Sequence, residues 1–223
     1  MKTRNILILA AAMLLCGTIT AQNVNVVNDA GVSKAELEEV TLRIKDKVGD
    51  FVSALGDLVD PDISTGTKRS IRTTSLNLFI GKGDRYHVTQ TNRYGQDSSY
   101  WHEPVQMETI QSKRNQKRSK SYMRDYLTGL IEKVTFRHVK IESADAIRVD
   151  SFQKTGDGKY QAVAYFLQHY MRYNSTDSYQ VYSDYTAKKV VIYMDRIEEV
   201  MPNGQLSVRW IIRLGDISAE EIW

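Results

Sequence analysis

The last third of the chain alternates between apolar and polar residues, and this pattern constrains the fold more than any other feature. In the stretch 205–217, one set of alternate positions is apolar: Leu206, Val208, Trp210, Ile212 and Leu214. The other set includes Ser207, Arg209 and Arg213. Such alternation is typical of a strand with one buried face. Turn signals at 156–158, 174–177 and 202–204 divide the region into predicted strands at 134–143, 146–154, 159–173, 179–200 and 205–217. Their short connections indicate antiparallel hairpins.

The earlier part of the chain has helical periodicity. Ser33, followed three residues later by Glu36, is a capping-box signature, and Asp60-Pro61 is a stop signal. Between them, apolar residues recur at steps of three and four and predict one long helix: Leu37, Val40, Ile44, Val48, Phe51, Val52, Leu55 and Leu58. Shorter helices are predicted at 68–80 and 122–133, and a further strand near 105–111. Gly81-Lys82-Gly83-Asp84 follows a helix, so we interpret it as a capped turn rather than a phosphate-binding loop.

These elements predict an α+β fold in which a long N-terminal helix packs on a strongly curved antiparallel sheet, with additional short helices. The sheet is expected to curve because right-handed twist accumulates along long strands. We expect residues 33–223 to form a single α+β domain, preceded by a flexible segment at 22–32.

Residues 1–21 have the pattern of a cleavable signal peptide. Lys2 and Arg4 precede an apolar run over 6–15, and small and polar residues lead to a cleavage site after Ala21. The apolar run is shorter than the roughly 20 residues that a membrane-spanning helix needs. We therefore expect an exported protein, periplasmic or extracellular, with no transmembrane anchor after processing. Lipidation at Cys16 stays open, although Leu15 stands where lipoprotein processing favours a small residue.

Composition excludes several function classes. Cys16 is the only cysteine, so disulfides, thiolate metal sites and a cysteine nucleophile are absent after cleavage. The full chain has 30 lysines and arginines and 27 acidic residues. Cleavage of the leader removes Lys2 and Arg4, so the net charge of the mature chain would be +1. A net charge this small gives no support for nucleic-acid binding. The local basic run Lys113, Arg114, Lys117, Arg118 and Lys120 is interpreted as a solvated loop or helix start. Scattered histidines predict no metal site, and we expect no cofactor.

The order of elements, ending in Trp210-Ile211-Ile212-Arg213-Leu214-Gly215-Asp216-Ile217, resembles the nuclear-transport-factor-2-like, or cystatin-like, α+β cone over residues 33–217. The Ala21-Gln22 junction and the segment 78–84 are also similar to exported Bacteroidetes proteins of uncharacterised role. The resemblance implies a pocket between the sheet and the first helix. Some members of the superfamily use this pocket for isomerase or dehydratase chemistry, and many use it only for binding.

Strand parity suggests two candidate catalytic residues for such a pocket. His169 is expected on the same strand face as Val163, Tyr165, Leu167, Met171 and Tyr173. Asp195 is expected on the same face as Val191, Tyr193 and Ile197. Each would need burial in an apolar cavity to become a useful general acid or base. The competing interpretation, which we favour, is that both are ordinary sheet residues, because one bulge reverses the parity.

A tyrosine-rich band between residues 160 and 193 supplies candidate ligand-binding residues, Tyr165, Tyr173 and Tyr193. We favour a non-catalytic, exported envelope module that recognises a small ligand, a glycan or a partner protein. The alternative is a small cofactor-free enzyme of isomerase or dehydratase type that uses His169 or Asp195. A homodimer formed through the outer face of the sheet is a further expectation that the sequence does not decide.

Overall fold

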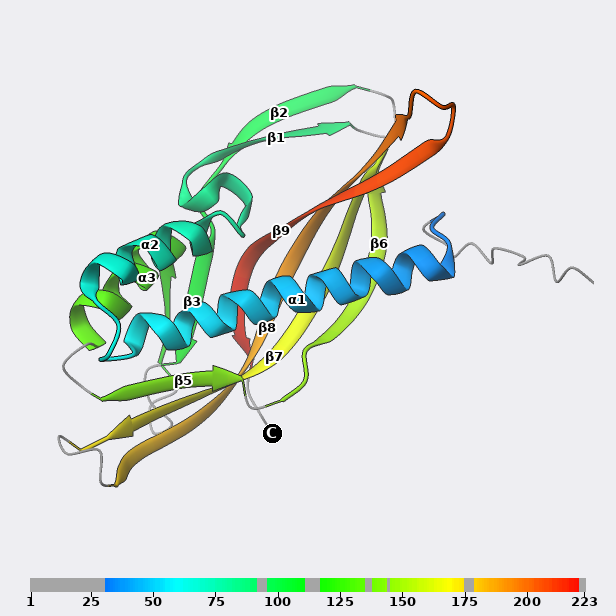
Figure 1. Ribbon diagram of the computed structural model, residues 1–223. Coiled ribbons are helices and arrows are strands. Elements are labelled where there is room, and N and C mark those ends of the chain that lie inside the picture. The colour runs from blue at the N-terminus through cyan, green and yellow to red at the C-terminus, as the bar shows by residue number, and fades with distance from the viewer. Residues whose placement is uncertain are drawn as a thin grey trace, which may run out of the picture.

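The computed structural model describes residues 31–91, 96–110, 117–134, 138–143, 145–174 and 179–220. The predicted signal peptide and its cleavage site lie outside these residues, as do Lys113 and Arg114 of the basic run. The described part of the chain is an α+β structure in which one long helix crosses the concave side of a large curved sheet (Figure 1). This arrangement confirms the predicted fold class.

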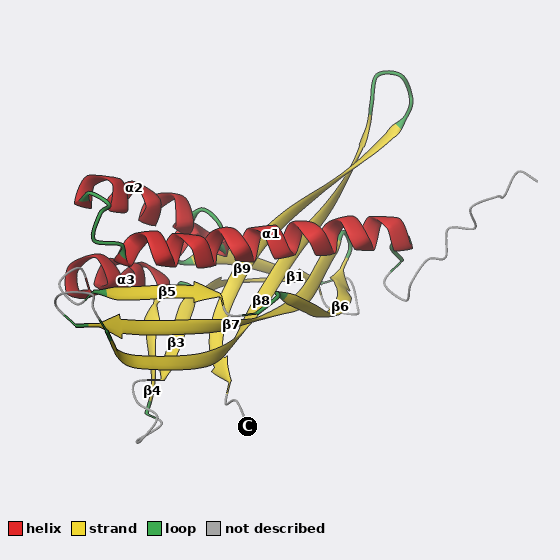
Figure 2. Ribbon diagram, turned by 60° about the horizontal axis from the view of Figure 1, so that its bottom comes forward, coloured by secondary structure: helices red, strands yellow, loops and turns green. Residues whose placement is uncertain are grey.

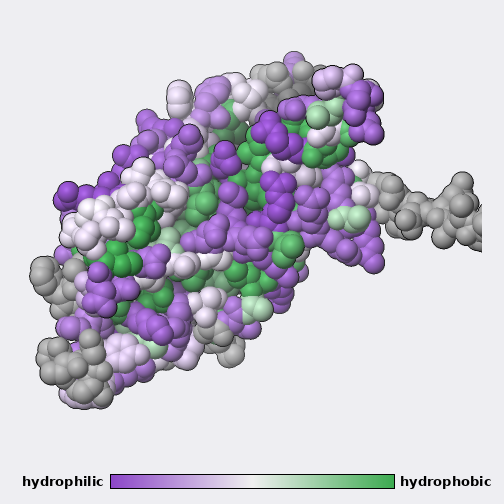
Figure 3. All heavy atoms as spheres, in the orientation of Figure 1, coloured by the Kyte–Doolittle hydropathy of each residue, from purple (hydrophilic) through white to green (hydrophobic). Residues whose placement is uncertain are grey.

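Helix α1 (Lys34–Val59) begins and ends where the sequence predicts. The Ser33 hydroxyl accepts a hydrogen bond from the Glu36 N–H at 3.3 Å and so satisfies one of the unpaired amides at the helix start. The predicted apolar stripe, from Val40 to Leu58, is buried against the sheet. Phe51 packs edge-on against Phe79, with ring centroids 5.0 Å apart. Figure 3 shows the hydrophilic outward side of α1, with hydrophobic side chains visible in patches on either side of it.

The second predicted helix ends earlier than expected. Helix α2 (Thr65–Leu76) stops because the next residues turn to join the sheet: Phe79 bridges Leu214, and the Leu214 N–H donates to the Leu78 carbonyl at 2.9 Å. A short helical turn, η1 (Ile80–Gly83), follows and contains Gly81 with φ 69°. A glycine takes this left-handed conformation without steric cost, as expected for a turn that closes a helical segment.

The third predicted helix divides into α3 (Met123–Gly129) and a π-helical turn, η2 (Leu130–Val134). The basic run was interpreted wrongly in part, because Arg118–Tyr122 forms strand β4 rather than a loop or a helix start. β4 pairs with β3 (Gln106–Ile110), the strand predicted near 105–111. A separate hairpin, β1 (Tyr86–Thr91) and β2 (Asp97–His102), was not predicted.

The large sheet has the strand order β4-β3-β9-β8-β7-β5, and β6 also pairs with β7. Its remaining strands are β5 (Val139–Ser143), β6 (Arg148–Gly156), β7 (Lys159–Tyr173), β8 (Gln180–Val200) and β9 (Leu206–Glu220). All pairs are antiparallel except β3 with β9, which run parallel. The predicted strands match these closely, except that β5 starts later than residue 134. The far end of the β8–β9 hairpin projects beyond α1 (Figure 2).

Alternation along β7 and β8 gives the sheet an inner face, toward α1, and an outer face. The inner face carries buried apolar residues that share one core with α1: Tyr160, Ala162, Ala164 and Phe166 from β7, and Val190, Ile192 and Met194 from β8. The β1–β2 hairpin meets the sheet elsewhere, where Lys159 Nζ donates to the Thr89 carbonyl at 3.3 Å.

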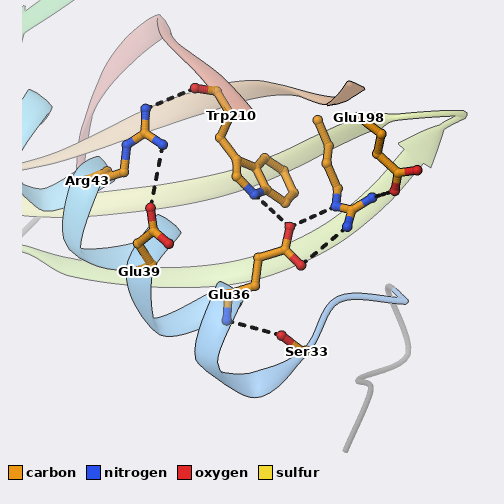
Figure 4. A network of polar contacts seen from close by, with 7 residues as sticks. Ser33, Glu36, Glu39, Arg43, Glu198 and Trp210 are labelled. Carbon is orange, nitrogen blue, oxygen red and sulfur yellow. Dashed lines mark hydrogen bonds and ion pairs between the residues drawn. The ribbon is translucent and has the colours of Figure 1, made fainter. Parts of the chain in front are cut away.

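A polar network fastens the start of α1 to the sheet (Figure 4). The Glu36 carboxylate accepts from Trp210 Nε1 at 2.9 Å and from Arg196 Nε at 2.8 Å. Arg196 also pairs with Glu198. Because the Glu36 and Arg196 side chains are only 18% and 19% exposed, this pair is shielded from water more than an ordinary surface ion pair.

Candidate functional site

A cavity of about 450 Å³ opens on the inner face of the sheet, beyond the end of the apolar core. Its volume lies in the range of roughly 300–1,000 Å³ that is usual for small-molecule sites. It is lined by residues of β3, α3, η2, β5, β7 and β8: Thr109, Ile110, Tyr126, Leu130, Ile141, Gln168, Tyr170, Arg172, Tyr182, Asp184, Thr186 and Lys188. We call this space the inner cavity.

Strand β7 changes character as it enters the inner cavity. Its inward residues are apolar up to Phe166, but the next inward residue is Gln168, which is only 6% exposed. The Gln168 side chain hydrogen-bonds to the Tyr126 hydroxyl of α3, and burial raises the pKa of that phenol to about 12. Tyr126 therefore stays protonated at any physiological pH and remains able to donate a hydrogen bond.

Strand β8 changes in the same way. Its inward residues from Val190 to Met194 are apolar, whereas Lys188, Thr186 and Asp184 line the cavity. The Tyr182 hydroxyl donates to Asp184 Oδ2 at 3.1 Å. Burial and the neighbouring Asp184 carboxylate both raise the pKa of Tyr182. This wall of the cavity thus presents a protonated phenol beside a carboxylate.

Lys188 is the most unusual residue of the inner cavity, because its side chain is only 2% exposed. Its Nζ donates to the Glu108 carbonyl oxygen of β3 at 2.6 Å. Burial lowers the pKa of Lys188 to about 8, and the Glu108 carboxylate opposes that shift without cancelling it. A lysine with this pKa is partly neutral slightly above neutral pH, so its amine is available as a base or nucleophile.

The Glu108 carboxylate ties three strands together beside Lys188. Its Oε2 accepts from the Ala219 N–H of β9 at 3.0 Å and lies 3.6 Å from Arg118 Nη1 of β4. Arg118 also donates to the Ala219 carbonyl at 2.9 Å. One arginine of the basic run therefore neutralises a buried carboxylate, a role that the run of charges did not indicate.

A second cavity, of about 390 Å³, lies where the end of α1 meets the edge strand β5. Tyr173, one of the predicted ligand-binding residues, lines it together with Asp60, His138 and Lys140. Its other lining residues are Gly56, Pro61, Val139 and Ile141. Only Tyr173 among the sequence-predicted site residues lies at either cavity.

The structure places His169 on the outer face, across the sheet from the inner cavity. Its ring stacks on Tyr185 with centroids 4.1 Å apart. Its Nε2 lies 2.9 Å from Ser183 Oγ, and its Nδ1 lies 3.4 Å from Glu142 Oε1. Lys140 and, more weakly, His169 lower the pKa of the Glu142 carboxyl group. His169 therefore belongs to a carboxylate–imidazole–hydroxyl array that spans β5, β7 and β8.

Asp195 lies on the same outer face but far from His169. It is exposed and pairs in register with Lys159, ten residues from His169 along β7. At about 3.3 Å per residue this is a separation of roughly 33 Å, so the two residues do not form one site.

Two of the predicted ligand-binding tyrosines also lie on the outer face. Tyr165 packs under the Arg148 guanidinium, 4.8 Å from its ring centroid. Tyr193 hydrogen-bonds with Tyr86 of the hairpin, and its ring lies against the Cα of Gly215, where any side chain would collide with it. Both rings are engaged in packing within the fold.

The sequence contains a signal for the inner cavity, at the positions where polar residues break an apolar alternation. On β7, Gln168 is a polar residue on the strand face that otherwise carries Tyr160, Ala162, Ala164 and Phe166. On β8, Asp184 and Lys188 are polar residues on the face that carries Val190, Ile192 and Met194. Polar residues on the buried parity of two neighbouring strands indicate a polar pocket, because an unpaired polar group is costly in a core. The meeting of these residues with Glu108 and Tyr126 has no sequence signal, since both come from distant elements.

Within the described residues, no group of three or more His, Cys, Asp and Glu side chains is arranged to hold a metal ion. In the same part of the chain, no helix combines the length and apolarity needed to cross a membrane.

Comparison with models of protein families gives no match, and neither does comparison with curated proteins. Among solved structures, the chain is similar to a nuclear transport factor 2 (NTF2-like) superfamily protein from Salmonella enterica serovar Typhimurium. The similarity covers 82% of this chain and 92% of that one, with 9% sequence identity and a TM-score of 0.39. A likeness of this size carries no functional argument, so the function of this chain must be inferred from its own residues.

Proposed function

We propose that this protein is a non-catalytic binding module that holds a small organic molecule in the inner cavity. The observation that carries the proposal is the set of buried polar side chains, Gln168, Asp184 and Lys188, on the same sheet face that forms the apolar core a few residues away. Placing polar groups there costs folding free energy unless they are satisfied by partners. Each of the three already has a protein partner, namely the Tyr126 hydroxyl, the Tyr182 hydroxyl and the Glu108 carbonyl oxygen, and a polar ligand can use the hydrogen-bonding capacity that these side chains retain at the cavity.

The lining favours a small molecule with an apolar body and several oxygen functions. Ile110, Leu130 and Ile141 offer apolar surface, and the phenols of Tyr126 and Tyr182 offer hydroxyl groups. The lining carries both cationic and acidic side chains, Lys188 and Arg172 against Asp184, so a strongly charged ligand would meet a like charge. These features favour a neutral ligand over a phosphate ester or a nucleic acid.

Export to the periplasm or the extracellular space is part of the proposal and is supported by the leader pattern at residues 1–21. Expression of the full chain with its leader, followed by N-terminal sequencing of the exported protein, tests it. A mature protein that starts at Gln22 supports export by this route, and an uncleaved intracellular product contradicts it.

The binding proposal is tested by thermal-shift screening of neutral alcohols, ketones, phenols and sugars against three forms of the protein. Thr186→Trp fills the inner cavity, whereas Tyr165→Ala removes an outer-face tyrosine and serves as the matched control. We expect compounds that raise the Tm of the unmodified protein and of Tyr165→Ala but not of Thr186→Trp. Binding that survives Thr186→Trp and is lost in Tyr165→Ala would move the site to the outer face.

The outer-face array favours a second candidate function, an acid–base enzyme of isomerase or dehydratase type that uses His169. The carboxylate–imidazole–hydroxyl contacts fix the orientation of the ring, as a general base requires. NMR detection of deuterium exchange next to the carbonyl group of simple ketones tests this function. Exchange that disappears in His169→Gln and persists in Thr186→Trp would favour the enzyme over the binding module.

A further inference from the structure

Lys188 and Lys189 are neighbours in sequence but face opposite sides of strand β8. The Lys188 side chain lines the inner cavity and is 2% exposed. The Lys189 side chain is 38% exposed and lies 3.9 Å from Glu220. Successive residues of a strand point to opposite faces, so the chain places one amine in a desolvated space and the next in water.

We propose that the Lys188 amine binds a small aldehyde or ketone covalently, as an imine, inside the inner cavity. This inference rests on the proposed binding function and specifies the chemical class of the ligand. The Glu108 carbonyl, 2.6 Å from Nζ, holds the amine in place through one N–H. The lone pair of the neutral amine is not used by that hydrogen bond and stays available for a carbonyl carbon.

The surroundings of Lys188 support this chemistry. Burial lowers the pKa of Lys188 to about 8, so about half of the amine is neutral at pH 8. The other charged or titratable groups around the cavity come from four further elements and from β8 itself: Glu108 of β3, Arg118 of β4, Tyr126 of α3, Tyr170 and Arg172 of β7, and Tyr182 and Asp184 of β8. Of these groups, Glu108 raises the pKa of Lys188, but burial outweighs it, so the charge of the amine is disfavoured.

The reaction needs no partner beyond the carbonyl compound. The nitrogen lone pair of Lys188 forms a bond to the carbonyl carbon, and one amine proton passes to the oxygen to give a carbinolamine. The oxygen then leaves as water with the second amine proton, and a carbon–nitrogen double bond remains. Nothing is oxidised or reduced.

Reductive trapping tests the inference with the two lysines as an internal comparison. The protein is treated at pH 8 with a low concentration of benzaldehyde and sodium cyanoborohydride, and the initial rate of benzylation is measured by peptide mass spectrometry. We expect Lys188 to react at least tenfold faster than Lys189. Comparable rates at the two lysines, or faster reaction at Lys189, overturn the inference. This ratio is measured within the unmodified protein, so it does not depend on the folding of a variant.

Two variants and a second probe complete the experiment. Lys188→Arg should abolish the fast reaction, and Lys189→Arg should leave it unchanged. Benzyl alcohol has the shape of the aldehyde without its carbonyl group, and NMR shifts of Tyr126 and Gln168 report its entry into the inner cavity. Shifts with benzyl alcohol but no selective trapping overturn the imine and leave the binding module intact. The absence of both shifts and trapping contradicts both proposals.

Discussion

The inner face shared by β7 and β8 is built differently at its two ends. Toward the start of α1, the inward residues Ala162, Ala164 and Ile192 are fully buried against the helix, and the Glu36 network closes that end. Toward α3, the inward residues Gln168, Asp184 and Lys188 are also buried, but they surround a cavity. The same strand pair thus provides stability in one half and polar groups for binding in the other.

The largest difference is expected between two truncations on the inward side of β8. Ile192→Ala removes a fully buried side chain from the apolar half and should lower the free energy of unfolding by about 2–5 kcal/mol. Thr186→Ala removes atoms that already border a cavity and should cost less than about 1 kcal/mol. Urea denaturation measures both. Equal losses would show that the cavity half is packed as tightly as the core.

Lys188 should make stability depend on pH. Its folded-state pKa of about 8 lies below its ordinary value of 10.5, so between these values the unfolded chain binds more protons and stability rises with pH. The rise should reach about 2 kcal/mol between pH 8 and pH 10, because one pKa unit corresponds to about 1.4 kcal/mol. The rise should be smaller by about this amount in Lys188→Met, where Lys47 and Lys68, whose pKa values burial also lowers, keep their own contribution. Urea denaturation of both proteins at several pH values measures the difference. Tyr86, Tyr126, Tyr182 and Tyr193, whose pKa values are raised above 10, lower stability as the pH approaches and passes 10, and the comparison with Lys188→Met removes their contribution.

A smaller effect is expected at the closed end of the inner face. Glu36→Gln removes the charge that pairs with Arg196 and should cost about 1–3 kcal/mol, since both side chains are largely shielded. The matched control is Glu39→Gln, one turn further along α1, which loses a surface contact of 3.8 Å with Arg43. The control should cost less than about 0.5 kcal/mol. The free energy of unfolding of both variants should be measured by thermal and urea unfolding in low and in high salt. Equal losses of stability that shrink in high salt would show that the Glu36–Arg196 pair is not shielded from water.

The smallest effect is expected where the chain leaves the core altogether. Leu206 is 58% exposed on the projecting end of the β8–β9 hairpin. Leu206→Ser should change the free energy of unfolding by less than about 0.5 kcal/mol, because the side chain buries little apolar area on folding. A loss of more than 1 kcal/mol by urea denaturation would contradict the exposed position of this hairpin.

The sequence predicted the elements that depend on local patterns. The stripe from Val40 to Leu58 and the cap at Ser33 predicted α1, and alternation with turn signals predicted β6 to β9, because periodicity and turn chemistry are properties of neighbouring residues. It failed where a long-range contact decided the outcome. Helix α2 ends at Leu76 because Leu78 and Phe79 join β9, and β4 forms because Arg118 and its neighbours pair with β3.

The candidate site was less predictable, because both faces of β7 are rich in apolar residues. Val163, Tyr165 and Leu167 look as suitable for a core as Ala162, Ala164 and Phe166, so parity alone pointed to the face of His169. Only the packing of α1 decides which face is inward. The sequence by itself determined that the chain makes a long helix and long twisted strands, since these follow from local preferences. The tertiary structure decided that Lys188 meets Glu108 and Tyr126 around a cavity, because residues far apart in sequence become neighbours only when the sheet curves around the helix.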